Sequence, residues 1–487
     1  MRKVVMIGID GLDADLLRVY GPALPNLRRL MLSSPFLDLT SCFPPDARTA
    51  WGSIYTGLNP ARHGVLGFSG DTEGQHLPRG RTFWDLASKA GRRVCILNPS
   101  LAWPAWPVNG LLLATSPRDS QVHIYPEQTT LAEDFPLLPR LAGLPEPKQL
   151  ETFYESLLDV TLKQSEAALA LLRQETWDVF SLQLDALDLV QHYYWRYSDP
   201  GDPDYPGRNQ FSSAIRQFYH LLDKIVGSVR SYMPRNAVLM VVSGHGHGRS
   251  SSQQLHLNRW LQTQHLQKTR FGLRRFLSAP YMRLKLKQRL IEFLLKVQLP
   301  ASAVRLITPE RSSASILEET SALLDPEATL ARSMSLLDMN AFGGISFSKE
   351  RIQAHGRNYE DVREQVQREL GELKHNGRAL VRWVKKREEL YAGYYLEDYP
   401  DLLFELQSDL AVGDELYAPL LGSQLAHYFV SGSHRRYGVF LINGVPEGMS
   451  ALEIEGDPDI MDVTPTLLSL LEIAGARLDG RALLQPS

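Results

Sequence analysis

The chain contains 487 residues, of which 44% are hydrophobic and 22% are charged. These are ordinary values for a folded globular protein, so they exclude a disordered, collagenous or coiled-coil chain. The formal charge is −3, because 52 lysines and arginines face 55 aspartates and glutamates. This balance provides no global electrostatic basis for binding nucleic acid. At about 150 residues per domain, the length predicts roughly three domains or one large α/β domain with insertions.

Cysteine content and hydropathy indicate the compartment in which the protein works. Its two cysteines, Cys42 and Cys95, are too few for a disulfide framework, and we interpret them as buried apolar residues in a reducing compartment. No apolar run reaches the ~18 residues that span a bilayer. The N-terminus leads directly into a short buried strand over Val4–Ile9, which is too short for a signal-peptide core. We therefore expect a soluble, cytoplasmic protein.

Short runs rich in β-branched residues alternate along the chain with longer helical patterns. Because these runs are apolar on both faces, they are typical of central strands in a mostly parallel sheet with helices on both faces. The alternation predicts a doubly wound α/β fold. The expected strands are Val4–Ile9, Arg93–Leu97, Val179–Leu184, Ala237–Val242 and Gly438–Ile442, and the expected helices are Thr82–Ala90, Glu151–Leu172, Phe211–Met233, Tyr359–Lys374 and Asp462–Ile473.

Two stretches interrupt this alternation and divide the predicted core into three parts, 1–116, 151–261 and 336–487. Residues 117–150 are proline-rich, and we expect them to form an irregular cap insertion. Residues 262–335 are expected to form a basic helical insertion, because 268–311 contains eleven lysines and arginines against two acidic residues. This amphipathic, positive segment is compatible with a cap over the active site, a peripheral contact with acidic lipid of a membrane, or a solvated helical insertion.

Polar residues gather after several predicted strands, at the edge of the sheet where open α/β folds bind ligands. Asp10 follows the first strand, and Asp188 and His192 follow the strand over 179–184. Their spacing of four residues places both side chains on one face of a helix. Three more histidines stand beside the two later strands, at His245, His247 and His434. Carboxylate and imidazole ligands without thiolates suit Zn²⁺ or Mn²⁺ in a site with an open coordination position.

A second motif follows the run near 36–41 and reads Pro44-Pro45-Asp46-Ala47-Arg48-Thr49. It predicts a loop that enters a helix, which Gly57 then ends. A hydroxyl group at a helix start would lie where backbone N–H groups and the helix dipole favour an oxyanion or a phosphate. Thr49 offers such a hydroxyl, whereas Asp46 and Ala47 occupy the helix entry. A purely structural role as cap and turn fits the same residues.

Together these motifs resemble the alkaline phosphatase superfamily, and specifically its type I phosphodiesterase/nucleotide pyrophosphatase branch. The resemblance covers nearly the whole chain, and it depends on the order and spacing of the motifs more than on any one of them. The motifs are Ile7-Gly8-Ile9-Asp10-Gly11, the block from Pro44-Pro45 to Asn59-Pro60-Ala61-Arg62-His63-Gly64, Thr82-Phe83-Trp84-Asp85-Leu86, the segment from Asp188 to Trp195, Gly244-His245-Gly246, Leu257-Asn258-Arg259-Trp260-Leu261, Phe342-Gly343-Gly344-Ile345 and Ser433-His434-Arg435.

The resemblance implies a mechanism with two metal ions, usually zinc. It assigns Asp188, His192 and His434 to the first ion. It assigns Asp10 and His245 to the second ion, together with an aspartate before that histidine and a nucleophilic threonine or serine. In the family, the metal-activated hydroxyl attacks phosphorus and the other metal stabilises the leaving oxygen.

Two positions depart from the family pattern. Gly244 stands where the family has an aspartate ligand, and Ala47 falls on the nucleophile when the motif is aligned without gaps from Pro44-Pro45 to Thr56-Gly57. Thr49 lies two residues further on, and two residues rotate a side chain by ~200° around a helix. We therefore expect the first metal site to be complete and the second to be weak or absent.

These observations leave two main functional hypotheses. The first is a metal-dependent hydrolase of phosphate mono- or diesters that acts on a small phosphorylated substrate, with His247 supplying the missing ligand and Asp46 or Thr49 acting in catalysis. The second is a catalytically degenerate family member that binds a ligand or a partner protein. Phosphomutase chemistry shares the fold but needs a phosphorylatable hydroxyl, which Ala47 lacks, so we rank it last.

Overall fold

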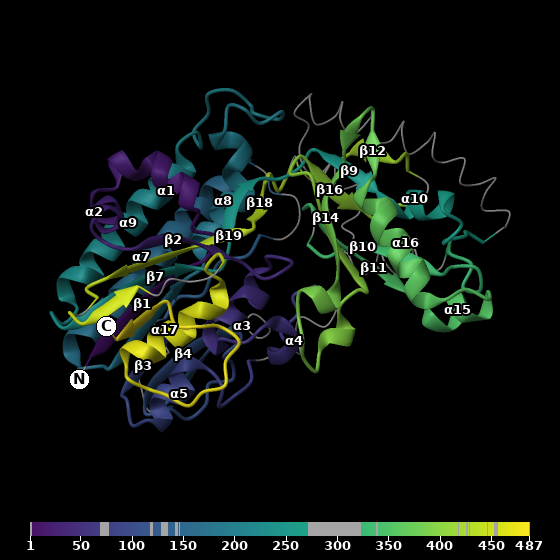
Figure 1. Cartoon of the computed structure of the whole chain (residues 1–487). Helices are drawn as coiled ribbons and strands as arrows, with labels where there is room; N and C mark the ends of the chain where they lie inside the picture. The colour runs from purple at the N-terminus through teal and green to yellow at the C-terminus, as the bar shows by residue number, and fades with distance from the viewer. Residues whose placement is uncertain are drawn as a thin grey trace.

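The computed structural model shows a large α/β core that contains both chain termini and a smaller lobe built from residues between 253 and 423 (Figure 1). The structure describes residues 2–68, 77–116, 120–127, 135–141, 145, 147–270, 323–337, 339–416, 418–424, 427, 429–445, 447–451 and 456–486.

The centre of the core is an eight-stranded, mostly parallel sheet. Its strands span Lys3–Ile9 (β1), Phe36–Thr40 (β2), Val94–Leu97 (β3), Gly110–Ser116 (β4), Gln121–Tyr125 (β5), Val179–Leu184 (β6), Ala237–Ser243 (β7) and Tyr437–Asn443 (β19). They lie in the order β2-β19-β7-β1-β6-β3-β4-β5. Strands β7, β1, β6, β3 and β4 are parallel, whereas β19 runs antiparallel to β7 and β2, and β5 runs antiparallel to β4. The predicted fold class is confirmed.

Strand β1 shows why the central runs are apolar at nearly every position. Val5, Ile7 and Ile9 belong to the buried cluster on one face of the sheet, and Val4 and Met6 belong to the cluster on the other face. Successive residues of a strand point to opposite faces, so a strand that is covered on both sides needs an unbroken apolar run.

Helices cover both faces of this sheet. The first face packs against α1 (Ala14–Tyr20), α2 (Pro25–Ser33), α7 (Pro147–Gln174), α8 (Ala186–Ser198) and α9 (Ala214–Tyr232). The second face packs against α3 (Ala47–Thr56), α5 (Phe83–Lys89) and α17 (Val463–Leu470), and the short α4 (Pro60–His63) follows α3. The helices predicted in the core are therefore confirmed, with ends shifted by a few residues. Within the described ranges, every helix is too short or too polar to serve as a membrane span.

The smaller lobe has its own hydrophobic core around an antiparallel sheet. Its strands lie in the order β10-β11-β15-β14 and span Ala331–Ser335 (β10), Phe342–Phe347 (β11), Val381–Lys386 (β14) and Leu402–Leu406 (β15). Helices α10 (Leu257–Thr263), α15 (Lys349–Ala354) and α16 (Tyr359–Gly371) pack against it. The prediction that all of 336–487 belongs to the α/β core is therefore wrong. Antiparallel strands pair without long helical crossovers, so these short strands give a weaker sequence pattern than the central parallel ones.

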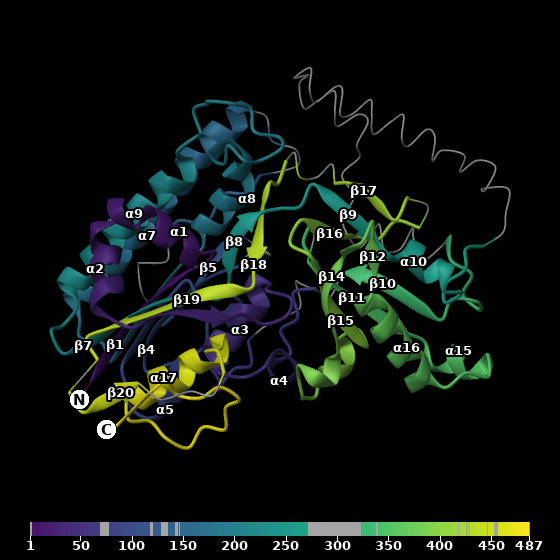
Figure 2. The same ribbon diagram turned by 45° about the horizontal axis from the view of Figure 1, so that its top comes forward.

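Three small sheets lie beside these two units. Strands β9 (Gln253–His256), β16 (Leu410–Gly413) and β17 (Leu421–Ser423) form one sheet, β12 (Lys374–His375) pairs with β13 (Arg378–Ala379), and β20 (Met449–Ala451) pairs with β21 (Leu484–Pro486). A further two-stranded ribbon consists of β8 (Gly246–Arg249) and β18 (Gly432–Arg435). This ribbon lies on the side of the core that faces the smaller lobe (Figure 2).

The two predicted insertions differ from expectation where the structure describes them. Residues 121–125, inside the stretch 117–150, form β5 and extend the central sheet by pairing with β4, so this part is not irregular. Residues 331–335, at the end of the stretch 262–335, form a strand of the smaller lobe. The basic segment 268–311 lies outside the described residues apart from 268–270, so its helical structure and its membrane contact stay predictions.

Gly8 of β1 reveals how closely α3 packs on the sheet. A Cβ atom at Gly8 would lie 2.6 Å from Cη2 of Trp51, and Nε1 of that tryptophan donates a 2.9 Å hydrogen bond to Asp10. Gly8→Ala should therefore displace Trp51 and lower the free energy of unfolding by about 1–3 kcal/mol in urea denaturation. The control Gly21→Ala, where a Cβ would meet no atom within 4 Å, should not destabilise the protein. Equal losses in both variants would contradict this account of the packing.

Candidate active site

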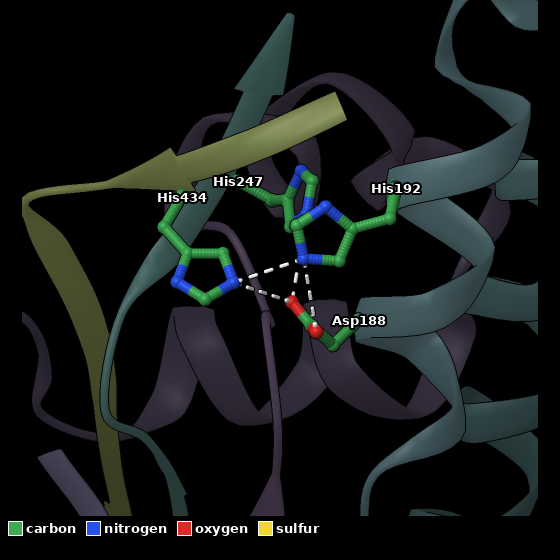
Figure 3. A group of neighbouring side chains, drawn as sticks. All are labelled: Asp188, His192, His247 and His434. Atoms are coloured by element: carbon green, nitrogen blue, oxygen red, sulfur yellow. Dashed lines mark hydrogen bonds and ion pairs between the residues drawn. The ribbon is translucent and has the colours of Figure 1, made fainter. Parts of the chain in front are cut away.

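Four of the predicted site residues lie together where α8 meets the β8–β18 ribbon. Asp188 and His192 come from consecutive turns of α8, and His247 and His434 are paired across the ribbon. Figure 3 shows the four side chains pointing toward one another. We call these four residues the histidine cluster.

The side chains of the histidine cluster converge on one carboxylate. Asp188 Oδ1 lies 3.3 Å from His434 Nε2 and 3.4 Å from His247 Nε2, and Asp188 Oδ2 lies 3.2 Å from His192 Nε2. His192 Nε2 and His434 Nε2 are 3.0 Å apart. Burial alone would raise the pKa of Asp188, but the neighbouring His192 and His434 outweigh it and hold this pKa well below its ordinary value. The carboxylate is therefore ionised.

Hydrogen bonds at the outer ring nitrogens determine which atoms face the centre of the cluster. His192 Nδ1 lies 2.9 Å from the carbonyl oxygen of Gly432, and His434 Nδ1 lies 2.7 Å from that of Pro45. A carbonyl oxygen only accepts, so each Nδ1 carries a proton and each Nε2 points toward Asp188 and the other ring. Two ring nitrogens 3.0 Å apart repel each other unless a proton or a metal ion lies between them. Burial would lower the pKa of His192, but the carboxylate of Asp188 outweighs it and raises this pKa, so a metal ion here would displace a proton. The donor set therefore fits a metal ion, and histidine ligands commonly bind a carbonyl group in this way.

His247 adds a third imidazole to the cluster. Among the described residues neither of its ring nitrogens forms a hydrogen bond. Burial, together with the positive charge of His192, lowers the pKa of His247 well below its usual range, so the ring is neutral, as a metal ligand must be. The ring is held in place by the indole of Trp195, which stacks on it, and by Asp13, whose Oδ2 accepts a 3.1 Å hydrogen bond from the His247 backbone.

Asp10 and His245 form a second group that shares Asp188 with the first. His245 Nε2 lies 3.2 Å from Asp10 Oδ1, and its Nδ1 lies 3.0 Å from the carbonyl oxygen of Gly246. Burial alone would lower the pKa of His245, but the charge of Asp10 and its hydrogen bond raise this pKa to about 9. A proton on His245 therefore satisfies Asp10, and a cation at the same place would have to displace that proton.

Comparison with protein-family models identifies the family. The model described as type I phosphodiesterase / nucleotide pyrophosphatase matches residues 4–419. The chain belongs to this family. The resemblance indicated by the sequence motifs is thereby confirmed, and the family places the chain among phosphodiesterase- and pyrophosphatase-type phosphoester hydrolases, which depend on metal ions. Among curated proteins, none matches the chain.

Two solved structures share the fold. Two structures of phosphonoacetate hydrolase from Sinorhizobium meliloti 1021, one with phosphonoacetate and one with phosphonoformate, give TM-scores of 0.54 and 0.53 at 14% sequence identity, and the similarity covers 97% of this chain and 96% of theirs. Murine ectonucleotide pyrophosphatase / phosphodiesterase 5 in complex with AMP gives a TM-score of 0.49 at 12% identity, over 99% of this chain and 97% of that protein.

Packing leaves no room for the aspartate that the family pattern has before His245. A Cβ atom at Gly244 would lie 2.8 Å from Cβ of Ala50 and 3.3 Å from Cδ1 of Ile54, and both of these residues belong to α3. The first distance is shorter than Cβ atoms tolerate, so a carboxylate at this position requires α3 to move. The close packing of α3 on the end of β7 therefore accompanies the loss of this carboxylate.

Two of the predicted catalytic residues, Asp46 and Thr49, bind each other in the first turn of α3. Asp46 is the N-cap residue, and its Oδ1 accepts hydrogen bonds from Thr49 N at 3.0 Å and Thr49 Oγ1 at 3.1 Å. Thr49 is fully buried, and its hydroxyl also accepts a 2.9 Å hydrogen bond from Gly67 N. The structure therefore places both side chains in a helix cap and does not bring them into the metal-binding groups.

A cavity of about 500 Å³ opens beside both groups and is lined by Asp10, Asp188 and Ala47 among others. Ala47, which falls on the family's nucleophile, is the first residue of α3 and contributes only a methyl group there. Asp46 and Thr49 are absent from the described lining because the helix turns their side chains away.

Asp185 lines the same cavity, although the sequence analysis did not select it. It follows β6 directly, and its oxygens accept hydrogen bonds from Asn98 Nδ2 at 3.1 Å and Gln183 Nε2 at 2.5 Å. Burial raises the pKa of Asp185 to about 7, and the negative charge of Asp10 adds to the shift. Asp185 stands at the carboxyl end of a predicted strand, and this position could have marked it as a site residue. Asp188 was selected as the site residue because it lies four residues before His192, on the same face of a helix.

The raised pKa of Asp185 makes stability depend on pH. The unfolded chain releases this proton near the ordinary value of 3.8 and the folded chain near 7, so the free energy of unfolding should fall as pH rises between these values. Asp185→Asn should remove that part of the slope, measured by thermal unfolding of chelator-treated protein from pH 4 to 8. Asp159→Asn, at an exposed position of α7, serves as the control and should keep the wild-type slope. If the free energy of unfolding depends on pH with the same slope in all three proteins, the raised pKa of Asp185 is refuted.

Proposed function

We propose that the protein is a metal-dependent hydrolase of phosphate mono- or diesters that binds one cation in the histidine cluster. The observation that carries this proposal is the convergence of Nε2 of His192 and Nε2 of His434 on Asp188, beside an open cavity. Three imidazoles and one carboxylate suit Zn²⁺ best, and Mn²⁺ is the second choice. We expect a second ion at Asp10 and His245 to be weak or absent, because the family's carboxylate is missing at Gly244.

The chain's own residues would bind and orient a small phosphorylated substrate in the cavity. The first turn of α3 borders it, and backbone N–H groups at a helix start favour phosphoryl oxygens. Arg48 and Arg140 also line the cavity and bring positive charge. A cation held by Asp188, His192 and His434 with one position left open to water would supply a Lewis acid and lower the pKa of that water toward neutrality.

Water is the nucleophile in this proposal. Ala47 has no hydroxyl, and the hydroxyl of Thr49 is bound in the helix cap. Asp185 lines the cavity with a pKa near 7, which suits a general base that accepts a proton from water at neutral pH. Direct attack by water proceeds in one displacement, so it differs from the covalent mechanism that the family resemblance implies.

A catalytically degenerate protein that binds a ligand or partner is the second candidate. The observation in its favour is that three residues with little or no side chain lie together at one end of the site, namely Ala47, Gly244 and Ala50. The first two positions lack groups that the family mechanism uses, and Ala50 occupies the space in which the missing carboxylate would lie.

Assays of the zinc-loaded protein test the proposed hydrolase. Wild type should hydrolyse an aryl phosphate monoester or diester, and His434→Ala should lower both the zinc affinity and the rate by about 10–100-fold or more, because a ligand is removed. The controls His355→Ala, at an exposed position outside the cluster, and Thr49→Val should keep the wild-type rate. A chiral thiophosphate substrate should react with inversion at phosphorus. Retention, or loss of activity in Thr49→Val alone, would show that the chain supplies the nucleophile after all.

Variants that restore the family residues test the second candidate, the catalytically degenerate protein. If wild type is inert on these esters, Ala47→Thr with Gly244→Asp should remain inert, since Cβ of Ala50 lies 2.8 Å from the new Cβ. Adding Ala50→Gly should create zinc-dependent turnover, because it removes the blocking atom. Activity in the double variant without the change at Ala50 would contradict this packing argument.

A further inference from the structure

A separate group of two carboxylates and one imidazole lies outside the site described above. His427 Nε2 is 3.1 Å from Asp202 Oδ1 and 4.0 Å from Asp204 Oδ2. All three residues offer ligand atoms within 4.8 Å of one another. The side chains of Asp202 and His427 are 0% and 1% exposed, whereas that of Asp204 is 41% exposed. The group is therefore buried on one side and open to solvent on the other.

The buried carboxylate of Asp202 is only partly compensated. Its Oδ1 accepts a 2.9 Å hydrogen bond from Asp204 N and contacts His427. Its Oδ2 is buried and forms no hydrogen bond among the described residues. In the same part of the chain no lysine or arginine forms an ion pair with Asp202. A buried carboxylate is costly unless positive charge is placed beside it.

The neighbouring Ser250 fixes the orientation of the imidazole. Ser250 Oγ donates a 3.1 Å hydrogen bond to the carbonyl oxygen of Val430, and it lies 2.8 Å from His427 Nδ1. Asp202 holds the ring from the other side, because His427 Nε2 forms a 3.1 Å hydrogen bond with Asp202 Oδ1. A proton on Nε2 serves this hydrogen bond in the metal-free protein, and a cation at the same place would displace it. Nε2 thus faces the two carboxylates. The pattern matches His192 and His434, whose outer nitrogens are bound in the same manner.

We propose that Asp202, Asp204 and His427 bind a divalent cation that serves a structural role. The donor set contains one nitrogen, two carboxylates and no thiolate, so it suits Zn²⁺ or Mn²⁺, with water filling the open side. A cation here would neutralise Asp202, satisfy its second oxygen and bind Nε2 of His427 in place of a proton. This site goes beyond the proposed hydrolase and does not depend on it.

The position of this site explains why a cation there would matter. Asp202 lies just beyond the end of α8, Ser250 directly follows β8, and His427 shortly precedes β18. These are the three elements that carry the histidine cluster. Ser431 reinforces the junction, because its Oγ accepts a 2.9 Å hydrogen bond from Arg196 N on α8 and its carbonyl accepts one of 2.7 Å from Ser250 N. The cation would therefore join the far ends of the three elements and hold them in register.

A hydrolytic serine triad is the other arrangement that the contacts of Ser250, His427 and Asp202 suggest. It requires a hydroxyl that a substrate can reach. Ser250 is only 3% exposed, and its hydroxyl is enclosed between the carbonyl oxygen of Val430 and Nδ1 of His427. The geometry therefore favours a cation site over a nucleophile.

Metal binding by the full-length protein with the histidine cluster removed tests this site. In the background His192→Ala with His434→Ala, chelator-stripped protein titrated with Zn²⁺ should still bind about one ion per chain, and this ion should raise the unfolding temperature. Adding Asp204→Asn should weaken the zinc affinity at least about tenfold and abolish the thermal shift. Asp204 is exposed, so this change should leave the fold of the metal-free protein intact.

Asp199→Asn in the same background is the matched control. It removes the same charge from the same loop, but Asp199 bonds to Gly201 N and Trp195 Nε1 and lies outside the group. This variant should keep the zinc affinity and the thermal shift. A background protein that binds no zinc, or equal losses in Asp204→Asn and Asp199→Asn, would overturn the proposal. Since the background lacks two ligands of the histidine cluster, neither result affects the assay that tests the hydrolase in the wild-type protein.

Discussion

The structure depends on one electrostatic constraint, the buried charge of Asp188 surrounded by three imidazoles. Two of these rings are turned by backbone carbonyls so that their Nε2 atoms lie 3.0 Å apart. Without positive charge between them this arrangement costs free energy, so the folded chain presents a site that a cation stabilises. The metal dependence of the family and the geometry of this chain therefore have the same physical origin.

Both units of the fold contribute to holding this arrangement. From the core, Asp13 accepts a hydrogen bond from His247 N while it also caps α1. From the side of the smaller lobe, Asn340 Nδ2 donates to Ser433 Oγ at 2.7 Å and to the carbonyl oxygen of His434 at 3.1 Å. The ribbon that carries two of the histidines is thus fixed from both directions. The group around Asp202 lies at the far ends of the same elements, which makes it a natural place for a structural cation.

The end of the site next to α3 is closely packed and lacks large side chains. Ala47 contributes a methyl group to the cavity, Gly244 lacks a side chain, and α3 packs so closely that Ala50 would contact any new Cβ at Gly244. These features belong together, because a helix can approach a strand end closely only where the side chain between them is missing. We therefore expect that reversing one position by itself leaves the family's second site incomplete, and we propose direct attack by water as the mechanism.

Sequence by itself predicted five strands of the central sheet, because strands buried on both faces leave continuous apolar runs. It also predicted the six residues that the structure brings together, since most of them follow these strands directly. They are Asp10, Asp188, His192, His245, His247 and His434. Tertiary structure alone decided three other matters. It separated the smaller lobe, whose short antiparallel strands leave a weak pattern. It brought Asp185 into the cavity. It also turned Thr49 and Asp46 into a helix cap. The direction of a side chain in the first turn of a helix depends on its hydrogen bonds and on the packing of the helix, here α3. The order of residues reveals neither of these.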